Sequence, residues 1–103
     1  MIQVVITKSN KQIKCLEVKG HANSAPYGQD LICAAVSSIM FGLCNAIEEA
    51  KLPCLIEIKK NRFLLQVEQA SQKLQHILYT AEMQLKTIEE SNNTFIQIKT
   101  LEV

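Results

Sequence analysis

The sequence lacks tryptophan, and only three glycines, two prolines and two histidines occur among its 103 residues. A chain of this length buries one compact core, which excludes a second domain and predicts a single domain over residues 1–103. It also lacks an excess of either charge, because it has 11 basic and 10 acidic side chains and a net charge of +1. Such a surface provides no long-range field for polyanions, so we expect no direct nucleic-acid partner.

Four cysteines are present, but none of them forms a Cys-x-x-Cys pair. With 48% hydrophobic residues, the chain has enough apolar surface to fold without disulfide bonds, which favours reduced thiols. A zinc site built from His21, Cys33, Cys44 and Cys54 would have no recognised ligand spacing. We therefore expect neither a metal nor another cofactor.

The amino-terminal residues contain neither a basic leader nor a small-residue cleavage site, so no secretory signal is visible and we expect a cytoplasmic location. Residues 31–47 carry no charge, but this run falls short of the roughly 20 apolar residues that cross a bilayer. It is also interrupted by Ser37, Ser38, Gly42 and Asn45. We interpret the run as a buried helix and expect no membrane partner.

Apolar periodicity predicts seven regular elements. Alternating residues indicate a hairpin at the start of the chain and a second hairpin after Pro53, while Asp30 and Ser71 stand where the caps of two helices are expected. The expected order is strand, strand, helix, strand, strand, helix, strand, over residues 2–7, 13–19, 31–51, 54–59, 63–67, 72–88 and 94–101. This order predicts an α+β fold in which two helices cover a mixed sheet.

The first helix is apolar nearly all round, because its hydrophobic residues cannot share one narrow stripe. We therefore expect it to be covered on more than one side. A sheet on one face and either a second helix or a second subunit on the other would both satisfy this pattern.

The candidate catalytic residues flank the irregular segment between the first hairpin and the first helix. Gly20 and His21 stand at its beginning, and Cys33 lies in the first turn of the helix that follows. The start of a helix favours a thiolate through the macrodipole, and its unpaired amides can donate to a developing oxyanion. If the loop folds back, His21 can act as general acid and base. In the alternative reading, Cys33 is a small core residue and His21 a turn residue.

Two neighbours of Cys33 have competing interpretations. Asp30 either caps the helix or orients His21 as the third member of a triad, and as a cap its carboxylate would oppose formation of the Cys33 thiolate. Ser37 follows Cys33 by one helical turn, so its hydroxyl could support the thiol or bind substrate. Alternatively, the Ser37 hydroxyl bonds to its own helix backbone.

A short basic segment, Lys59-Lys60-Asn61-Arg62, separates the two strands of the second hairpin. Only one aromatic residue, Phe63, adjoins it. We interpret this segment as a solvated hairpin tip rather than as an RNA-binding patch.

The string Gly20-His21-Ala22, followed by Tyr27-Gly28-Gln29-Asp30-Leu31-Ile32-Cys33-Ala34-Ala35-Val36-Ser37, resembles the ribosomal-processing cysteine protease family, often called Prp. The resemblance covers the whole chain in length and element order, although only residues 20–37 carry the specific motif. It implies that His21 and Cys33 form the catalytic pair, with Asp30, Ser37 and Gly20 as supporting neighbours. The family loop often has more glycines where this chain has residues 23–26, which suggests a stiffer loop here and puts its rate of opening in question.

The resemblance further implies a cytoplasmic, homodimeric cysteine endopeptidase. Its substrate would be the N-terminal extension of large-subunit ribosomal protein twenty-seven, cut within a hydrophobic, aromatic-containing segment during ribosome maturation. The competing hypothesis is a non-catalytic module that binds a ribosomal protein precursor and in which Cys33 is merely buried.

Overall fold

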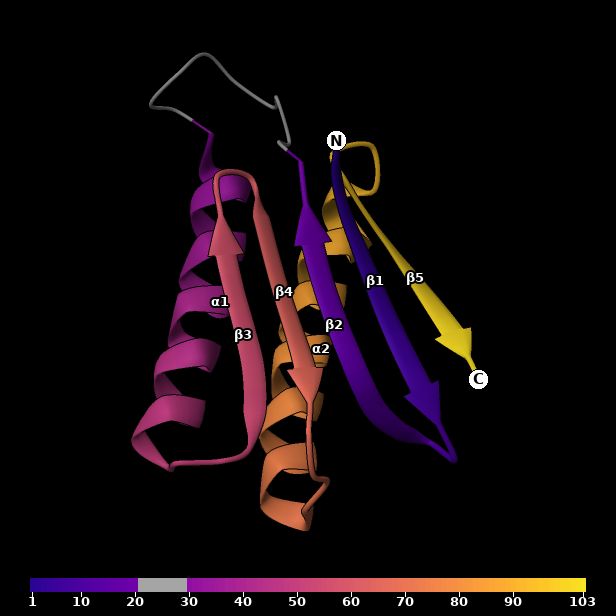
Figure 1. Cartoon of the computed structure of the whole chain (residues 1–103). Coiled ribbons are helices and arrows are strands. Elements are labelled where there is room, and N and C mark those ends of the chain that lie inside the picture. Colours follow the sequence, from indigo (N-terminus) through magenta and orange to yellow (C-terminus); the bar gives the residue numbers. More distant parts are fainter. Residues whose placement is uncertain (21–29) are drawn as a thin grey trace.

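The computed structural model describes residues 1–20 and 30–103, and within them it contains the seven elements in the expected order. These elements are β1 (Ile2–Ser9), β2 (Gln12–Lys19), α1 (Leu31–Glu49), β3 (Cys54–Lys59), β4 (Arg62–Val67), α2 (Gln72–Asn92) and β5 (Ile96–Glu102). The five strands form one sheet in the order β3-β4-β2-β1-β5 (Figure 1). Only β1 and β5 pair in parallel, so the sheet is mixed as predicted.

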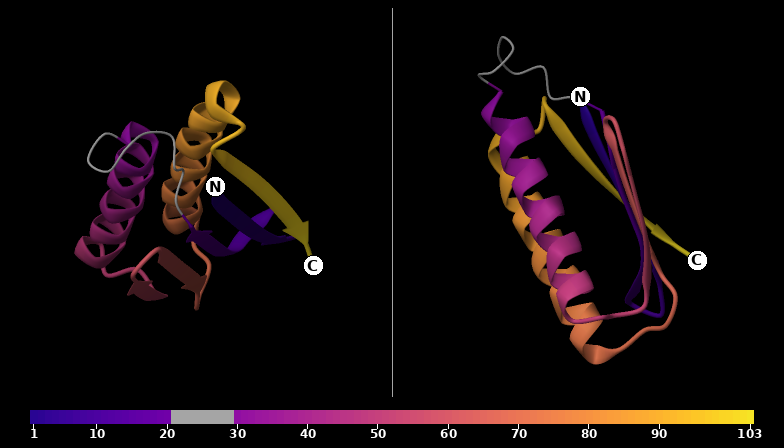
Figure 2. Two further views of the ribbon diagram at one scale, coloured as in Figure 1. Left: turned by 90° about the horizontal axis from the view of Figure 1, so that it is seen from above. Right: turned by 60° about the vertical axis from the view of Figure 1, so that its left-hand side comes forward.

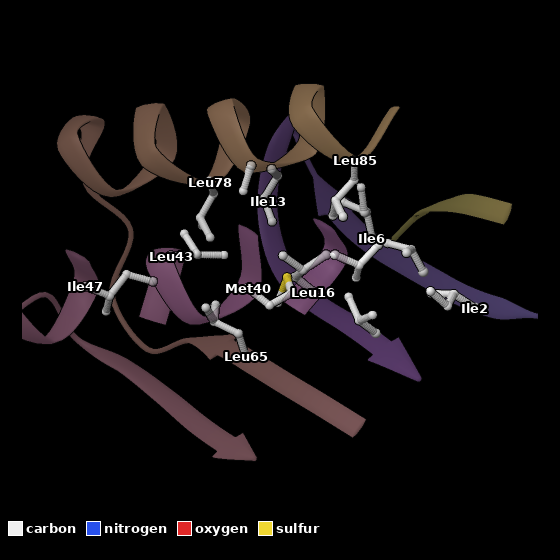
Figure 3. Close-up of a cluster of buried hydrophobic side chains, with 14 of the residues drawn as sticks. Ile2, Ile6, Ile13, Leu16, Met40, Leu43, Ile47, Leu65, Leu78 and Leu85 are labelled. Atoms are coloured by element: carbon white, nitrogen blue, oxygen red, sulfur yellow. The ribbon is translucent and has the colours of Figure 1, made fainter. Parts of the chain in front are cut away.

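Both helices lie on the same face of the sheet, which makes the molecule a two-layer α+β structure (Figure 2). The core fills the space between these layers with side chains from the inner face of the sheet and from the facing sides of α1 and α2 (Figure 3). The helical side chains with the least exposure include Met40 of α1 and Leu74, Leu78 and Leu85 of α2. The predicted α+β fold is confirmed.

The first hairpin turns at Asn10 and Lys11, which both have positive φ values, of 51° and 65°. Two-residue turns with both central residues in this region match the twist of the flanking strands, and asparagine tolerates the conformation well. The turn therefore fixes how β1 and β2 begin to pair.

A β-bulge follows in β2, where the pairing with β1 shifts by one residue and passes over Lys14. Because of the extra residue, Ile13 and Leu16 both face the core although three positions separate them. The bulge is held from the helix layer by Gln75 of α2. Its side-chain amide donates to the Ile13 carbonyl at 2.9 Å, and its oxygen accepts from the Ile13 amide at 2.7 Å.

By length and apolar composition alone, α1 could cross a membrane, a test that the core helices of soluble proteins also pass. In this structure α1 directs five side chains, Val36, Met40, Leu43, Cys44 and Ile47, into the protein. The sheet covers one of its sides and α2 lies along another (Figure 2). The expected cover on more than one side is thus present, and it follows one of the two arrangements that the apolar pattern left open. Its outer side exposes mostly small and polar residues, together with Leu31. Phe41 is also partly exposed, but its ring contacts Phe63 of β4.

One charged side chain of the helix layer is buried. Glu82 of α2 is 2% exposed, and its carboxylate lies 3.0 Å from the ammonium groups of both Lys8 and Lys86. The sequence pattern gave no indication of this cluster, because glutamate on a helix is usually solvated.

Candidate active site

The candidate site lies at the end of the sheet where β2 ends and α1 begins. Gly20 follows β2 with a φ of 95°, a conformation that side chains rarely adopt, and a Cβ atom here would overlap the carbonyl oxygen of Met1. The Gly20 amide donates to the Asn61 carbonyl at 3.0 Å. These constraints fix the direction in which the chain leaves the sheet just before His21.

Asp30 begins the other side of the site as the N-cap of α1. Its Oδ1 atom accepts the amide proton of Cys33 at 3.0 Å, and its carbonyl oxygen accepts the Ala34 amide at 3.2 Å. The capping interpretation of Asp30 is therefore confirmed. The cap engages the amide of Cys33. The first-turn amides of Leu31 and Ile32 are therefore better candidates for oxyanion donors than the Cys33 amide.

Cys33 is the third residue of α1 and is half-buried against the core. It lines a pocket of about 250 Å³ between the first turns of α1 and the adjoining end of the sheet. Ser37 lines the same pocket, as the one-turn spacing predicted, and so does Gly20. Three of the residues singled out in the sequence thus border one cavity.

The walls of the pocket are mainly apolar. Their hydrophobic residues are Ile2, Val18, Val36, Phe41, Ile58 and Phe63. Two of these, Phe41 of α1 and Phe63 of β4, meet edge to face, with ring centroids 4.9 Å apart and an interplanar angle of 82°. A cavity beside a cysteine with such walls suits an apolar side chain of a bound molecule.

The second hairpin contributes a larger part of the site than the sequence indicated. Ile58, Lys59, Asn61 and Phe63 all line the pocket, whereas the basic segment was interpreted only as a solvated tip. The one available signal was the apolar alternation of β3, which continues to Ile58 next to the turn. Ile58 is 46% exposed, because it faces the pocket instead of the closed core.

Charges near this hairpin are largely paired. Arg62 contacts Glu17 of the neighbouring β2 at 2.6 Å, and Lys59 contacts Glu57 at 3.0 Å. The Lys59 hydrogen bond, followed by its charge, lowers the pKa of Glu57 from the usual range. The two charged residues that line the pocket, Lys19 and Lys59, are both basic, and the charge of Lys59 is offset by its contact with Glu57.

The other three cysteines have environments that disfavour a thiolate. Burial, followed by the nearby Glu17, raises the pKa of Cys15, although Arg62 acts in the opposite direction. Burial and Glu48 raise the pKa of Cys44. Burial and then Glu68 raise the pKa of Cys54, so all three residues are held as neutral thiols at physiological pH.

His21 and the substituted loop positions 23–26 lie outside the described residues. The pairing of His21 with Cys33 therefore stays a prediction, as does a contact between His21 and Asp30. Within residues 1–20 and 30–103, no group of three or more histidine, cysteine or acidic side chains is placed to hold a metal ion. The zinc set considered in the sequence includes His21 and is not described as a whole.

Two curated relatives are similar in sequence to this chain along most of their length. The chain is 35% identical over 109 residues to the ribosomal processing cysteine protease Prp of Bacillus subtilis, covering 97% of both chains. It is 36% identical over 84 residues to the protein of that name from Mycoplasma pneumoniae, covering 82% of this chain and 84% of the relative.

A solved structure of similar fold is that of the essential ribosomal processing protease Prp from S. aureus in complex with a covalently linked product peptide. It superimposes with a TM-score of 0.91 at 31% identity and covers 97% of this chain and 99% of its own. A second structure of the S. aureus protease, bound to a substrate peptide, gives a TM-score of 0.85 at 30% identity. The family model for cysteine protease Prp matches residues 1–97, and with these relatives it shows that the chain belongs to the Prp family of cysteine proteases.

Proposed function

We propose that this protein is the endopeptidase that removes the N-terminal extension of large-subunit ribosomal protein twenty-seven, with Cys33 as nucleophile and His21 as general acid and base. The observation that carries the proposal is the position of Cys33, in the first turn of α1 and on the wall of an apolar pocket, in a member of a cysteine protease family. The motif around residues 20–37 selects Cys33 among the four cysteines, and the raised pKa values of the other three support that choice.

In the proposed reaction, the thiolate of Cys33 forms a bond to the carbonyl carbon of the scissile peptide. The tetrahedral intermediate collapses, the C–N bond breaks, and His21 gives a proton to the departing amine. Water activated by His21 then attacks the thioester, which releases the new carboxylate and restores the thiol. Two chemically easier steps thereby replace one difficult hydrolysis.

Each tetrahedral intermediate carries an oxyanion that needs hydrogen-bond donors. The start of α1 provides them through amides that have no carbonyl four residues earlier within the helix. Because Asp30 already accepts from the Cys33 amide, the proposal assigns this role to the preceding amides of Leu31 and Ile32 while the cap is in place.

Two observations support the choice of substrate. The relatives are named for ribosomal processing, and the S. aureus protease was solved with a substrate peptide and with a covalently linked product peptide. The apolar and aromatic lining of the pocket, with Phe41 and Phe63, also suits the hydrophobic, aromatic-containing segment that the resemblance implies.

The proposal places the reaction in the cytoplasm and expects a homodimer. Its support is the thiol state of the four cysteines and the exposure of large apolar side chains on the helices, including Phe41, Tyr79 and Met83. Sedimentation of the purified chain over a range of concentrations tests the assembly directly.

The decisive experiment is mass spectrometry of a synthetic peptide that spans the N-terminal extension, after incubation with the wild-type protein. Cys33→Ala is the test variant, and Cys15→Ala is the matched control because it removes another half-buried thiol. We expect one cut in the presence of wild type and Cys15→Ala, and none with Cys33→Ala. A peptide that binds but remains whole with wild type would favour the non-catalytic binding module, and cleavage by Cys33→Ala would refute the mechanism.

A further inference from the structure

The sheet has an open edge next to the candidate active site. β3 is the first strand in the sheet order and pairs on one side with β4, while no strand among the described residues pairs with its other side (Figure 1). An exposed edge presents a row of backbone donors and acceptors that an extended peptide can complete. The pairing of β3 with β4 shows which backbone groups of β3 lie at this edge.

The hairpin register determines which backbone groups of β3 face outward. Lys59 and Arg62 are paired across a two-residue turn, and such a closing pair hydrogen-bonds to each other. Bonded pairs alternate along antiparallel strands, so Leu55, Glu57 and Lys59 direct their amides and carbonyls toward β4. The amides and carbonyls of Cys54, Ile56 and Ile58 therefore point away from β4, to the open edge.

This edge leads directly into the pocket. Ile58 and Lys59, at the carboxyl end of β3, line the same cavity as Cys33. The opposite edge of the sheet is β5, and no residue of β5 lines that cavity. Only β3 thus joins an unpaired strand edge to the candidate nucleophile within the described residues.

The composition of β3 limits the length of the open edge. Pro53 precedes the strand, and Lys59 ends it in an ion pair with Glu57 at 3.0 Å. Proline and charged residues discourage pairing along an edge, whereas the residues from Cys54 to Ile58 are apolar except for Glu57. The edge is thus suited to a short, extended and apolar segment.

We propose that the peptide substrate binds as an additional strand along β3, with hydrogen bonds to the backbone of Ile56 and Ile58, and passes from there to Cys33. The inference rests on the proposed function, because it names how the substrate of that same site is held. Main-chain pairing fixes the extended conformation of the peptide, and the apolar pocket receives one of its side chains. The scissile carbonyl is thereby positioned by a rigid sheet.

The first test is amide hydrogen exchange measured by NMR on full-length Cys33→Ala, with and without the ribosomal extension peptide. In the free protein, we expect the Ile56 and Ile58 amides to exchange faster than those of Leu55 and Glu57, which are bonded to β4. Saturating peptide should slow exchange at Ile56 and Ile58 by at least about fivefold, the value of one ordinary hydrogen bond, and leave their neighbours unchanged. Binding through side chains alone would not give this alternation.

A second test separates the backbone of Ile58 from its side chain. Ile58→Pro removes the outward amide, and Ile58→Ala is its control because it removes side-chain contact but keeps the amide. We expect cleavage of the peptide, as kcat/KM, to fall about fivefold further in Ile58→Pro than in Ile58→Ala. If Ile58→Pro does not fold by circular dichroism, peptides with single N-methylated amides replace it, and loss of cleavage at alternate peptide positions is then expected.

The outcomes distinguish the two proposals. A peptide that wild type cuts without alternating protection at β3 overturns the added strand and leaves the proposed function intact. Protection of Ile56 and Ile58 that rises with protein concentration in the absence of peptide would assign the edge to a second copy of this chain, which also overturns it. A peptide that is neither cut nor protective at β3 refutes both proposals.

Discussion

The carboxylate of Asp30 accepts the amide proton of Cys33 at 3.0 Å, so the residue that starts α1 is bonded to the backbone of the candidate nucleophile. The cap stabilises the first turn, in which the helix dipole favours a thiolate. The same carboxylate places a negative charge beside that thiol and opposes its ionisation. Asp30 therefore couples the stability of α1 to the reactivity of Cys33, and substitutions can separate the two effects.

For Asp30, we predict that Asp30→Ala lowers the free energy of unfolding by about 1 kcal/mol, whereas Asp30→Asn retains it, because asparagine also caps helices. In Asp30→Asn the negative charge is absent, so Cys33 should react faster with iodoacetamide. Urea unfolding and alkylation followed by peptide mapping measure these two effects. Ser71→Ala is the matched control, because Ser71 caps α2 by accepting the Leu74 amide proton at 3.2 Å. This variant should lose a similar amount of stability and cleave the peptide at an unchanged rate. Unaltered stability with lost cleavage in Asp30→Asn would instead assign the carboxylate to orienting His21.

The four thiols should differ in reactivity. At neutral pH we expect Cys33 to be alkylated much faster than Cys15, Cys44 and Cys54, whose raised pKa values keep them protonated. The rates of the three slow thiols should still rise above roughly pH 9.5, where an exposed model thiol has levelled off. Mass spectrometry of digests after timed alkylation gives each rate. Equal rates for all four residues at pH 7 would contradict the assignment of Cys33.

Two glycines should respond to the same substitution in opposite directions. Gly20→Ala should destabilise the fold by roughly 1–3 kcal/mol, because Gly20 has a φ of 95° and an added methyl group meets the Met1 carbonyl. Gly42→Ala should stabilise it by about 0.5–1 kcal/mol, since Gly42 lies within α1 and a Cβ atom there has open space. Thermal unfolding of both variants checks the sign of each change. Tolerance of Gly20→Ala would show that the entry to the loop is not constrained as described.

The β-bulge should depend on Gln75. Gln75→Ala removes both hydrogen bonds to Ile13 and leaves a partly buried amide and carbonyl unsatisfied, so we expect a loss of about 2 kcal/mol in unfolding free energy. Gln84→Ala, an exposed glutamine on the same helix, is the control and should change stability little. Chemical denaturation measures both, and equal effects would refute a specific role for Gln75.

Glu82 should make stability depend on pH in the acid range. Burial opposes its ionisation, but hydrogen bonds and charge from Lys86 and Lys8 prevail and lower its pKa from the usual range. The stabilisation by these ion pairs is therefore fully present above the unfolded-state pKa and is lost as the pH falls through the lower folded-state value. Glu82→Gln should be less stable than wild type at pH 7 by about 2 kcal/mol, and the difference should shrink toward pH 3. A difference in stability between the two proteins that stays constant from pH 7 to pH 3 would show that the ion pairs of Glu82 are not its cause.

Local sequence patterns were enough to predict the seven elements, because apolar alternation, helical spacing and capping residues act over a few positions. It also determined the family, since residues 20–37 carry the motif in one contiguous stretch. Asp30 could be identified as a cap in the same way, because the bond spans three residues. The roles of His21 and Ser37 in catalysis stay predictions.

The remaining features depend on contacts between segments that are far apart in the sequence. The order of strands placed β3 at the edge, and the β3–β4 hairpin brought Ile58 and Asn61 to the pocket that also contains Cys33. The bond from Gln75 to Ile13 spans 62 residues, and the ion pair between Glu82 and Lys8 links α2 to β1. Such contacts arise from packing two layers around a shared core, and no local periodicity records which distant residues that packing brings together.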